Sequence, residues 1–254
     1  MLIFVAFVWG AEFTLIDLAM EIIPVNTFNA LRFILAGLAL IPLLILSSEN
    51  IPRALIRPLL LKGSILGLLL FIAFYTQTEG LKHTTVSNAG FITGLASPLV
   101  PVLGLLLFRT KVSRSVCLGV IFATVGLYLL TVVLICAFAF AIHMLLTGRF
   151  VSALPVIPLT IVQLFAVGIY SAISAFISSE PAFYLAENTP LSWQESLLTP
   201  IVLSAILIAG IIGTAYAYWA QSACQKILPD YKVALIFTLE PIFACLTAGI
   251  FLNE

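Results

Sequence analysis

The sequence predicts an all-α integral membrane protein, and two observations carry that prediction. First, hydrophobic residues make up 62% of the 254 residues and charged residues only 9%, with a mean hydropathy of +1.22. A soluble core could not bury that much apolar surface, so the surrounding solvent must be lipid. Second, the apolar runs are long and unbroken, which excludes the alternating pattern of a membrane β-barrel and leaves helices to satisfy the backbone.

Nine apolar segments follow one another along the chain, each near the roughly 20 residues that a membrane-spanning helix requires. The stretch from Val116 to Leu146 contains no cluster of turn residues, so it is either one long helix or two spans. Counting it as two, the predicted spans are 2–20, 27–47, 60–79, 86–108, 114–131, 132–148, 155–177, 197–222 and 232–252.

The placement of Lys and Arg favours two spans in that stretch and a cytoplasmic N-terminus, because short cytoplasmic loops retain positive charge. In that arrangement only Arg32 and Lys82 fall outside the cytoplasmic loops, and the external segment 180–195 carries three glutamates and no basic residue. The short loops favour a bacterial inner membrane. The cytoplasmic basic residues are then Arg53, Arg57, Lys62, Arg109, Lys111, Arg114, Arg149, Lys226 and Lys232.

Two blocks of the chain recur later in it. Residues 8–32 align with 139–163 at an offset of 131, and residues 75–98 align with 218–241 at an offset of 143. By the span count the two copies start on opposite sides of the membrane. We therefore expect inverted repeats, residues 1–131 with spans one to five and residues 132–254 with spans six to nine, and a shared cavity between them.

The chain contains four short motifs: Trp9-Gly10, Leu31-Arg32-Phe33, Gly80-Leu81-Lys82 and Leu239-Glu240-Pro241. Together with the paired halves, they resemble the drug/metabolite transporter superfamily, specifically the EamA-type transporters. The resemblance implies ten helices in two inverted five-helix repeats. About nine of these are expected in this chain, with the tenth span missing. The resemblance also implies export or exchange of amino acids and other small metabolites.

Glu12 is the strongest candidate for a functional side chain. It lies near the middle of the first span, where an ionisable group is costly and usually faces a cavity or a partner. It could bind an amine, hold a proton or pair with a cation, or it could form a structural ion pair with Arg32. Arg32 itself could meet a substrate carboxylate or extend to the membrane interface. His143 is the repeat equivalent of Glu12 and could titrate near physiological pH.

Matched polar and aromatic clusters occur on the two spans that the second alignment pairs. Such clusters suit a cavity that receives amphipathic solutes, and the alternative is a belt of aromatic residues at the membrane interface. Combined with the ionisable residues, they complete the candidate substrate-binding set. This set is Glu12, Arg32, Tyr75, Gln77, His143, Tyr216, Tyr218, Trp219 and Gln221.

A second set is expected to have structural or coupling roles. Asn88, with Thr93 and Ser97 on the same span, favours close helix packing over ligand contact. Glu240 precedes a proline inside a span, where a carboxylate and a freed carbonyl could shape a kink or bind a cation. The set comprises Trp9, Gly10, Asn88, Pro98, Glu240 and Pro241.

These features predict a secondary active transporter that moves amino acids or related amphipathic solutes by alternating access, with export as the expected direction. Nothing in the sequence resembles a phosphate-binding loop, so a proton or counter-solute gradient would supply the driving force. A multidrug or cation efflux carrier of the same fold is the alternative. A channel is less favoured, and so is an intramembrane enzyme, since neither His83 nor His143 has a nearby second ligand or nucleophile.

Other chemistries are not expected. Basic and acidic residues number 11 each, which removes the argument for a nucleic-acid partner. The four cysteines lie singly in apolar stretches, without the spacing of a metal or redox site. We therefore expect no catalytic residues, no metal and no cofactor, and the partners are the lipid bilayer and a small-molecule substrate.

Overall fold

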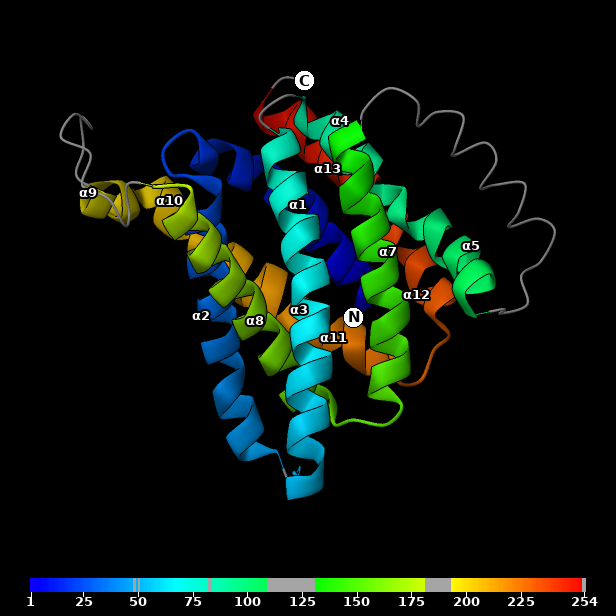
Figure 1. The fold of residues 1–254 in the computed structure, drawn as a ribbon. Coiled ribbons are helices and arrows are strands. Elements are labelled where there is room, and N and C mark those ends of the chain that lie inside the picture. The colour runs from blue at the N-terminus through cyan, green and yellow to red at the C-terminus, as the bar shows by residue number, and fades with distance from the viewer. Residues whose placement is uncertain (48, 50, 82–83, 109–130, 181–192, 253–254) are drawn as a thin grey trace.

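The structure is a computed structural model that describes residues 1–47, 49, 51–81, 84–108, 131–180 and 193–252 (Figure 1). Every regular element within these residues is a helix, which confirms the all-α prediction. In chain order the elements are α1 (Leu2–Met20), α2 (Val25–Leu46), α3 (Arg53–Leu81), α4 (Val86–Gly94), α5 (Ala96–Phe108), α7 (Thr131–Val151), α8 (Val156–Ile177), α9 (Trp193–Leu198), α10 (Pro200–Leu207), the π-helix η2 (Ile208–Tyr216), α11 (Ala217–Gln225), α12 (Asp230–Phe237) and α13 (Glu240–Phe251).

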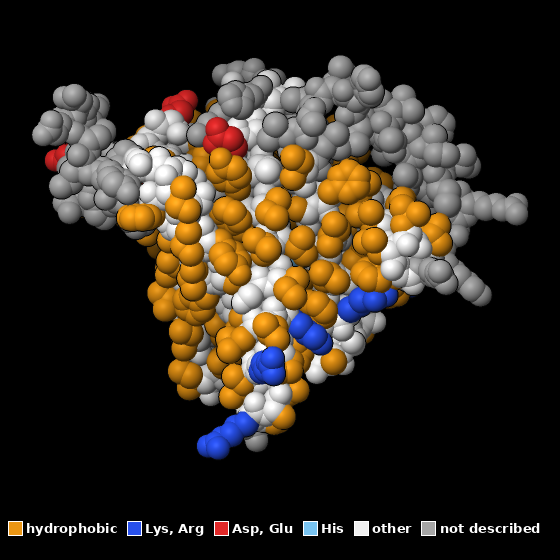
Figure 2. Space-filling view, viewed as in Figure 1, with side chains coloured by type: hydrophobic (Ala, Val, Ile, Leu, Met, Phe, Trp, Pro, Cys, Tyr) orange, Lys and Arg blue, Asp and Glu red, His pale blue; other side chains and the backbone are white. Residues whose placement is uncertain are grey.

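Most of these helices are long and apolar enough to cross a membrane. The described residues contain seven candidate spans, with a shorter apolar stretch of α7 as an eighth, and these correspond to eight of the nine predicted segments. The remaining segment, 114–131, lies outside the described residues except for its last position. Large apolar side chains cover the face shown in Figure 2, as expected for a surface in contact with lipid. The protein is an integral membrane protein.

Two of the predicted spans are interrupted in the middle. The segment 86–108 breaks at Leu95, between α4 and α5, and the segment 232–252 breaks at Thr238 and Leu239, between α12 and α13. The breaks are repeat equivalents, because 238 − 95 equals the alignment offset of 143. Pro98 lies three residues after Leu95 and Pro241 three residues after Thr238, and proline cannot supply the N–H that would continue the preceding helix. The apolar pattern of the sequence had predicted one continuous span for each segment.

The centre of the molecule shows the inverted symmetry directly. Where α2 crosses α8, a Cβ added to Gly37 would lie 3.0 Å from the ring of Phe165, and one added to Gly168 would lie 2.7 Å from Ile34. Both pairs of positions, 34 with 165 and 37 with 168, are related by the offset of 131. Each contact is therefore the counterpart of the other, so an approximate two-fold axis passes between α2 and α8.

Basic side chains gather at one end of the helices. Of the seven Lys and Arg residues that the structure describes, all except Arg32 lie where α3 begins, where α7 ends, or at the turn from α11 to α12. The Lys62 ammonium group lies 4.9 Å from the ring centroid of Phe150, which joins two of these regions. In Figure 2 the visible Lys and Arg side chains lie below and the visible acidic ones above. We refer to this part of the molecule as the basic end.

The helices of the second half run opposite to their counterparts in the first. Both α1 and α3 run away from the basic end, whereas α7 and the α10–η2–α11 segment run toward it. The pairs α2 with α8, and α4–α5 with α12–α13, are reversed in the same way. The described helices thus confirm the inverted repeat architecture.

Candidate functional site

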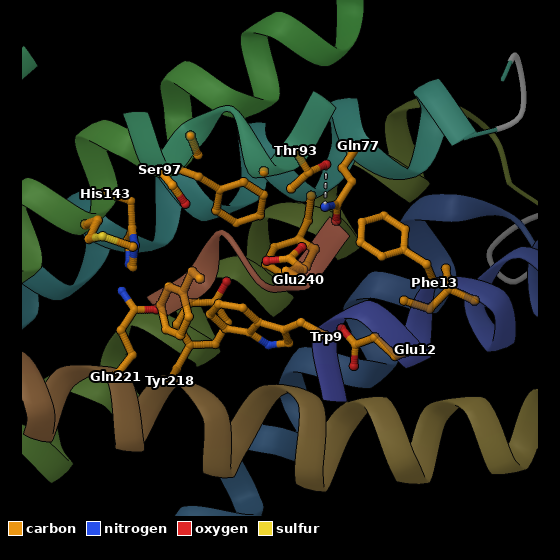
Figure 3. A pocket seen from close by; sticks show the side chains of 17 residues that line it. Trp9, Glu12, Phe13, Gln77, Thr93, Ser97, His143, Tyr218, Gln221 and Glu240 are labelled. Carbon is orange, nitrogen blue, oxygen red and sulfur yellow. Dashed lines mark hydrogen bonds between the residues drawn. The ribbon is translucent and has the colours of Figure 1, made fainter. Parts of the chain in front are cut away.

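A cavity lies at the centre of the molecule, between the two halves. The cavity and the open space at its mouth together measure about 600 Å³, so the enclosed part is smaller than this figure. Helices of both repeats contribute to its wall, which is the usual place for a solute site in a transporter built from inverted repeats. The lining residues are Trp9, Glu12, Phe13 and Ile16 of α1, Phe74 and Gln77 of α3, Thr93 and Gly94 of α4, Ala96 and Ser97 of α5, Phe140, His143 and Met144 of α7, Tyr218 and Gln221 of α11, Phe237 of α12 and Glu240 of α13 (Figure 3).

Aromatic side chains form much of the wall. The ring of Trp9 lies 5.5 Å from that of Tyr218 and 4.8 Å from that of Phe237, centroid to centroid. The indole Nε1 of Trp9 donates a hydrogen bond of 2.7 Å to the carbonyl oxygen of Gly213, which fixes the plane of the ring. Apolar walls with a few directed polar groups are typical of small-molecule sites.

Glu12 and Arg32 form a buried ion pair beside the cavity. Arg32 Nη2 donates to Glu12 Oε1 at 2.5 Å, and Arg32 Nε donates to the hydroxyl of Thr214 at 2.7 Å. The Arg32 side chain is fully buried, with its guanidinium carbon 4.9 Å from the ring centroid of Phe74. The sequence left this ion pair open as the alternative for Glu12, and the structure contains it.

The second half contains the counterpart of that pair. His143 Nε2 donates to Gln163 Oε1 at 3.0 Å, and the Thr147 hydroxyl lies 3.3 Å from the same nitrogen. His143 is the repeat equivalent of Glu12, and Gln163 is the repeat equivalent of Arg32, both at the offset of 131. Because an amide oxygen can only accept, the proton is assigned to Nε2.

The π-helix η2 holds the first of these pairs in place. Its Thr214 accepts from Arg32, its Gly213 carbonyl accepts from Trp9, and the Glu12 carboxylate lies against Gly213 so closely that a Cβ there would overlap it. A π-helical segment inside a long helix often marks a functional site. Here it brings side chains of α1 and α2 to one point of the α10–η2–α11 segment.

Glu240 is the second carboxylate of the cavity. It begins α13, directly after the break in that span, and only 7% of its surface is exposed. Within the described part of the chain its carboxylate has no hydrogen bond or ion pair. Its backbone carbonyl lies beside Gly10, where an added Cβ would be 2.6 Å away, so glycine allows α1 to approach α13.

Side-chain amides complete the polar part of the wall. Gln77 Nε2 donates to the Thr93 hydroxyl at 3.1 Å, which joins α3 to α4. Gln221 Nε2 donates to Gln225 Oε1 at 3.1 Å, and Gln225 in turn donates to Asp230. These bonds connect the cavity wall to the turn between α11 and α12 at the basic end.

Five of the nine residues predicted to bind substrate line the cavity: Glu12, Gln77, His143, Tyr218 and Gln221. Two residues expected to have structural or coupling roles, Trp9 and Glu240, line it as well. Of the other members of that second set, Gly10 packs on α13, Pro241 packs against Gly94, Asn88 is exposed, and Pro98 is half-buried outside the lining.

Four members of the predicted set do not line this cavity: Arg32, Tyr75, Tyr216 and Trp219. Arg32 already bonds Glu12 and Thr214, as a buried guanidinium requires. Tyr75 lies two residues from Gln77, so it points to the opposite side of α3, where it stacks on Phe71 with 36% of its surface exposed.

The remaining two aromatic residues pack on the outer side of the same segment. Tyr216 makes an edge contact with Phe4, at 5.7 Å between ring centroids, and a tilted contact with Trp219 at 6.0 Å. Both are half-buried. Their position follows from the helical turn, which separates them from Tyr218 and Gln221.

Other residues of the wall were not predicted from the sequence. Thr93 and Ser97 were favoured as packing residues, yet both line the cavity. The chain has 19 phenylalanines, and no sequence signal distinguished the four at the cavity from the others. Gln163 could have been found, because the alignment that pairs Glu12 with His143 also pairs Arg32 with Gln163.

Comparison with known sequences identifies the family. A sequence model of the EamA-like transporter family matches the chain twice, over residues 1–132 and over residues 129–254. The chain belongs to the EamA-like transporter family. This agrees with the resemblance seen in its short motifs, and together with the transporter names of related proteins it points to a membrane transporter.

Similar proteins carry general names. An "Uncharacterized transporter" of Archaeoglobus fulgidus is 26% identical over 260 residues, covering 98% of this chain and 76% of the relative. The "Uncharacterized transporter YetK" of Bacillus subtilis is 28% identical over 119 residues, covering 46% of this chain and 36% of the relative. A solved crystal structure with 16% sequence identity superposes with a TM-score of 0.69, covering 98% of this chain and 86% of that one, which shows a shared fold.

Proposed function

We propose that this EamA-family protein is a secondary active transporter that exports small amphipathic metabolites, amino acids or related solutes, by alternating access. The observation that supports this proposal best is the position of the cavity. It lies where two inverted halves meet, and residues of both halves line it. Residues 1–131 and 132–254 would be the two repeats, and exchange of their conformations would open the cavity first to one side and then to the other.

The interrupted spans supply positions for such a movement. Each break lies beside the cavity, between Gly94 and Ala96 in the first half and between Phe237 and Glu240 in the second, and all four of these residues line it. A helix that is already divided can change the angle between its parts without breaking a continuous hydrogen-bond ladder.

For orientation, we propose that the basic end faces the cytoplasm, together with the N-terminus, in a bacterial inner membrane. The six Lys and Arg residues of that end support this assignment, because cytoplasmic loops retain positive charge. Proton or counter-solute coupling would drive transport, and the buried titratable residues Glu12, His143 and Glu240 are the candidate proton carriers.

Solute counterflow in proteoliposomes tests the proposal. Vesicles containing the protein are loaded with one unlabelled solute, and uptake of the same labelled solute is measured for a panel of amino acids and amines, with and without a pH gradient. We expect at least one solute to exchange, and Glu12→Gln to slow that exchange by about tenfold or more, since it leaves Arg32 without its counter-charge.

Glu21→Gln is the matched control, because Glu21 is exposed and lies at the end of α1, outside the cavity. The control variant is expected to exchange solute at the wild-type rate. Absence of counterflow for every solute in the panel would contradict the proposed function.

A further inference from the structure

We propose that the cavity selects a small organic cation, an amine or quaternary ammonium with an apolar body and no carboxylate, and that Glu240 is its counter-ion. The inference rests on the proposed function, because it takes the cavity to be the solute site. It narrows the substrate class from amphipathic solutes in general to one sign of charge.

The charges around the cavity do not cancel. Among the residues that the structure describes, two carboxylates line it, Glu12 and Glu240, and no Lys or Arg does. Arg32 neutralises Glu12 from behind, through a 2.5 Å hydrogen bond. Glu240 is left as the one lining carboxylate without a basic partner within the described residues.

A buried carboxylate without a partner is unfavourable unless a cation or a proton neutralises it. Glu240 is 7% exposed and faces the open space in Figure 3. A ligand ammonium group can enter and pair with the carboxylate, which would recover the cost of burial.

The walls around Glu240 suit such a ligand. The faces and edges of Trp9, Tyr218 and Phe237 surround the same space, and aromatic rings attract cations through their quadrupole. The Tyr218 hydroxyl is buried and has no hydrogen-bond partner among the described residues. That hydroxyl is itself enclosed, so Tyr218 would contribute its ring and not its oxygen to a ligand in the cavity.

An amino acid fits the same wall less well. Its ammonium group could pair with Glu240, but its carboxylate would need a donor with positive charge. Arg32 is outside the lining and already bonds Glu12 and Thr214. His143 uses its Nε2 for Gln163. The carboxylate of a zwitterion would therefore be buried without a counter-charge, at a cost that a plain amine avoids.

Three probes of similar shape test the proposal on the full chain in lipid nanodiscs by calorimetric titration. 2-Phenylethylamine carries the charge, 2-phenylethanol replaces the ammonium with a neutral hydroxyl, and phenylalanine adds a carboxylate. We expect the amine to bind about tenfold tighter, or more, than either of the other two. An amine that binds no tighter than the alcohol or phenylalanine, or that does not bind, would overturn the proposal.

Two variants assign the effect to Glu240. Glu240→Gln removes the charge at nearly constant shape and should weaken amine binding by about tenfold or more, while binding of the alcohol changes less than about twofold. The control Glu21→Gln should leave both affinities unchanged. Wild-type amine affinity in folded Glu240→Gln would overturn the assignment. If Glu240→Gln cannot be obtained folded, Glu240→Asp is tested instead, because it keeps the charge. This variant should retain the preference for amine over alcohol, and loss of that preference would overturn the assignment to Glu240.

Counterflow separates this proposal from the proposed function. If wild-type vesicles exchange amino acids but not the amine, the cation site is wrong and the carrier function stands. If they exchange the amine and Glu240→Gln vesicles do not, both are supported.

Discussion

The Glu12–Arg32 pair of the first half and the His143–Gln163 pair of the second occupy equivalent positions in the two repeats. Each joins residues 20 apart in sequence, and each lies beside the cavity between a first and a second helix of its half. The first is an ion pair and the second is a neutral hydrogen bond. The same scaffold position therefore holds charge in one half only.

This difference shows how symmetric backbones can support an asymmetric site. The crossing of α2 and α8 repeats the same glycine contacts on both sides of the axis, so the frame is shared. Among the described residues at the cavity and its two flanking pairs, the charged side chains are Glu12, Arg32 and Glu240. The part of the wall formed by α7 and α11 presents neutral amides, hydroxyls and an imidazole. The comparison also predicts unequal costs when each pair is broken.

The largest effect is expected from Arg32→Met. It leaves the Glu12 carboxylate buried without its partner, and loss of one member of a buried ion pair typically costs about 3–5 kcal/mol of stability. Thermal unfolding of the purified protein in detergent, followed by circular dichroism, measures this change. The double variant Glu12→Gln with Arg32→Met should recover most of the loss. A double variant as unstable as Arg32→Met would show that the ion pair is not what Arg32 stabilises.

A smaller effect is expected from Gln163→Leu in the second half. It removes the acceptor of the His143 Nε2 proton, and an unsatisfied buried donor costs about 1–3 kcal/mol. The same unfolding measurement applies, with Thr160→Val, one turn earlier on α8, as a control that keeps the His143 bond. Equal losses for Gln163→Leu and Arg32→Met would contradict the distinction between the charged and the neutral pair.

The apolar spans were the part of the fold that the sequence predicted best, because length and composition alone set them. The offset alignment also predicted the inverted arrangement and the equivalence of Glu12 with His143. It did not predict the division at Leu95 or at Thr238, since Pro98 and Pro241 are each compatible with a kinked continuous helix. The π-helix η2 had no sequence signal either.

Side-chain direction limited the prediction of the site. Tyr75 and Gln77 are two residues apart and were assigned to the same cavity, but only the packing of α3 determines which of the two faces inward. The pairing of Glu12 with Arg32 depends on how α1, α2 and η2 meet, and the sequence left it as one of two alternatives. The residues that line the cavity through apolar contact, such as Phe140, look like any other core residue.

The smallest effect is expected from Tyr75→Leu, which tests the contrast between the outer face of α3 and the cavity. The exposed ring of Tyr75 stacks on Phe71 at the outer side of α3. Its replacement should therefore change the free energy of unfolding by no more than about 0.5 kcal/mol. Counterflow should stay at the wild-type rate. In contrast, Tyr218→Phe removes a buried hydroxyl at the cavity and should slow exchange. Slower exchange for Tyr75→Leu than for Tyr218→Phe would indicate that the solute path lies along the outer face of α3 and not through the cavity.

The central claim is that the cavity between the two halves is the solute path, and Ser97→Cys tests it most directly. Ser97 lines the cavity and is 6% exposed, and the substitution changes one atom. With the four native cysteines replaced by alanine, a membrane-impermeant thiol reagent is applied to oriented proteoliposomes from either side during counterflow. The account predicts labelling from both sides, protection by a transported solute, and loss of exchange once Cys is modified. Wild-type exchange after complete modification would contradict it.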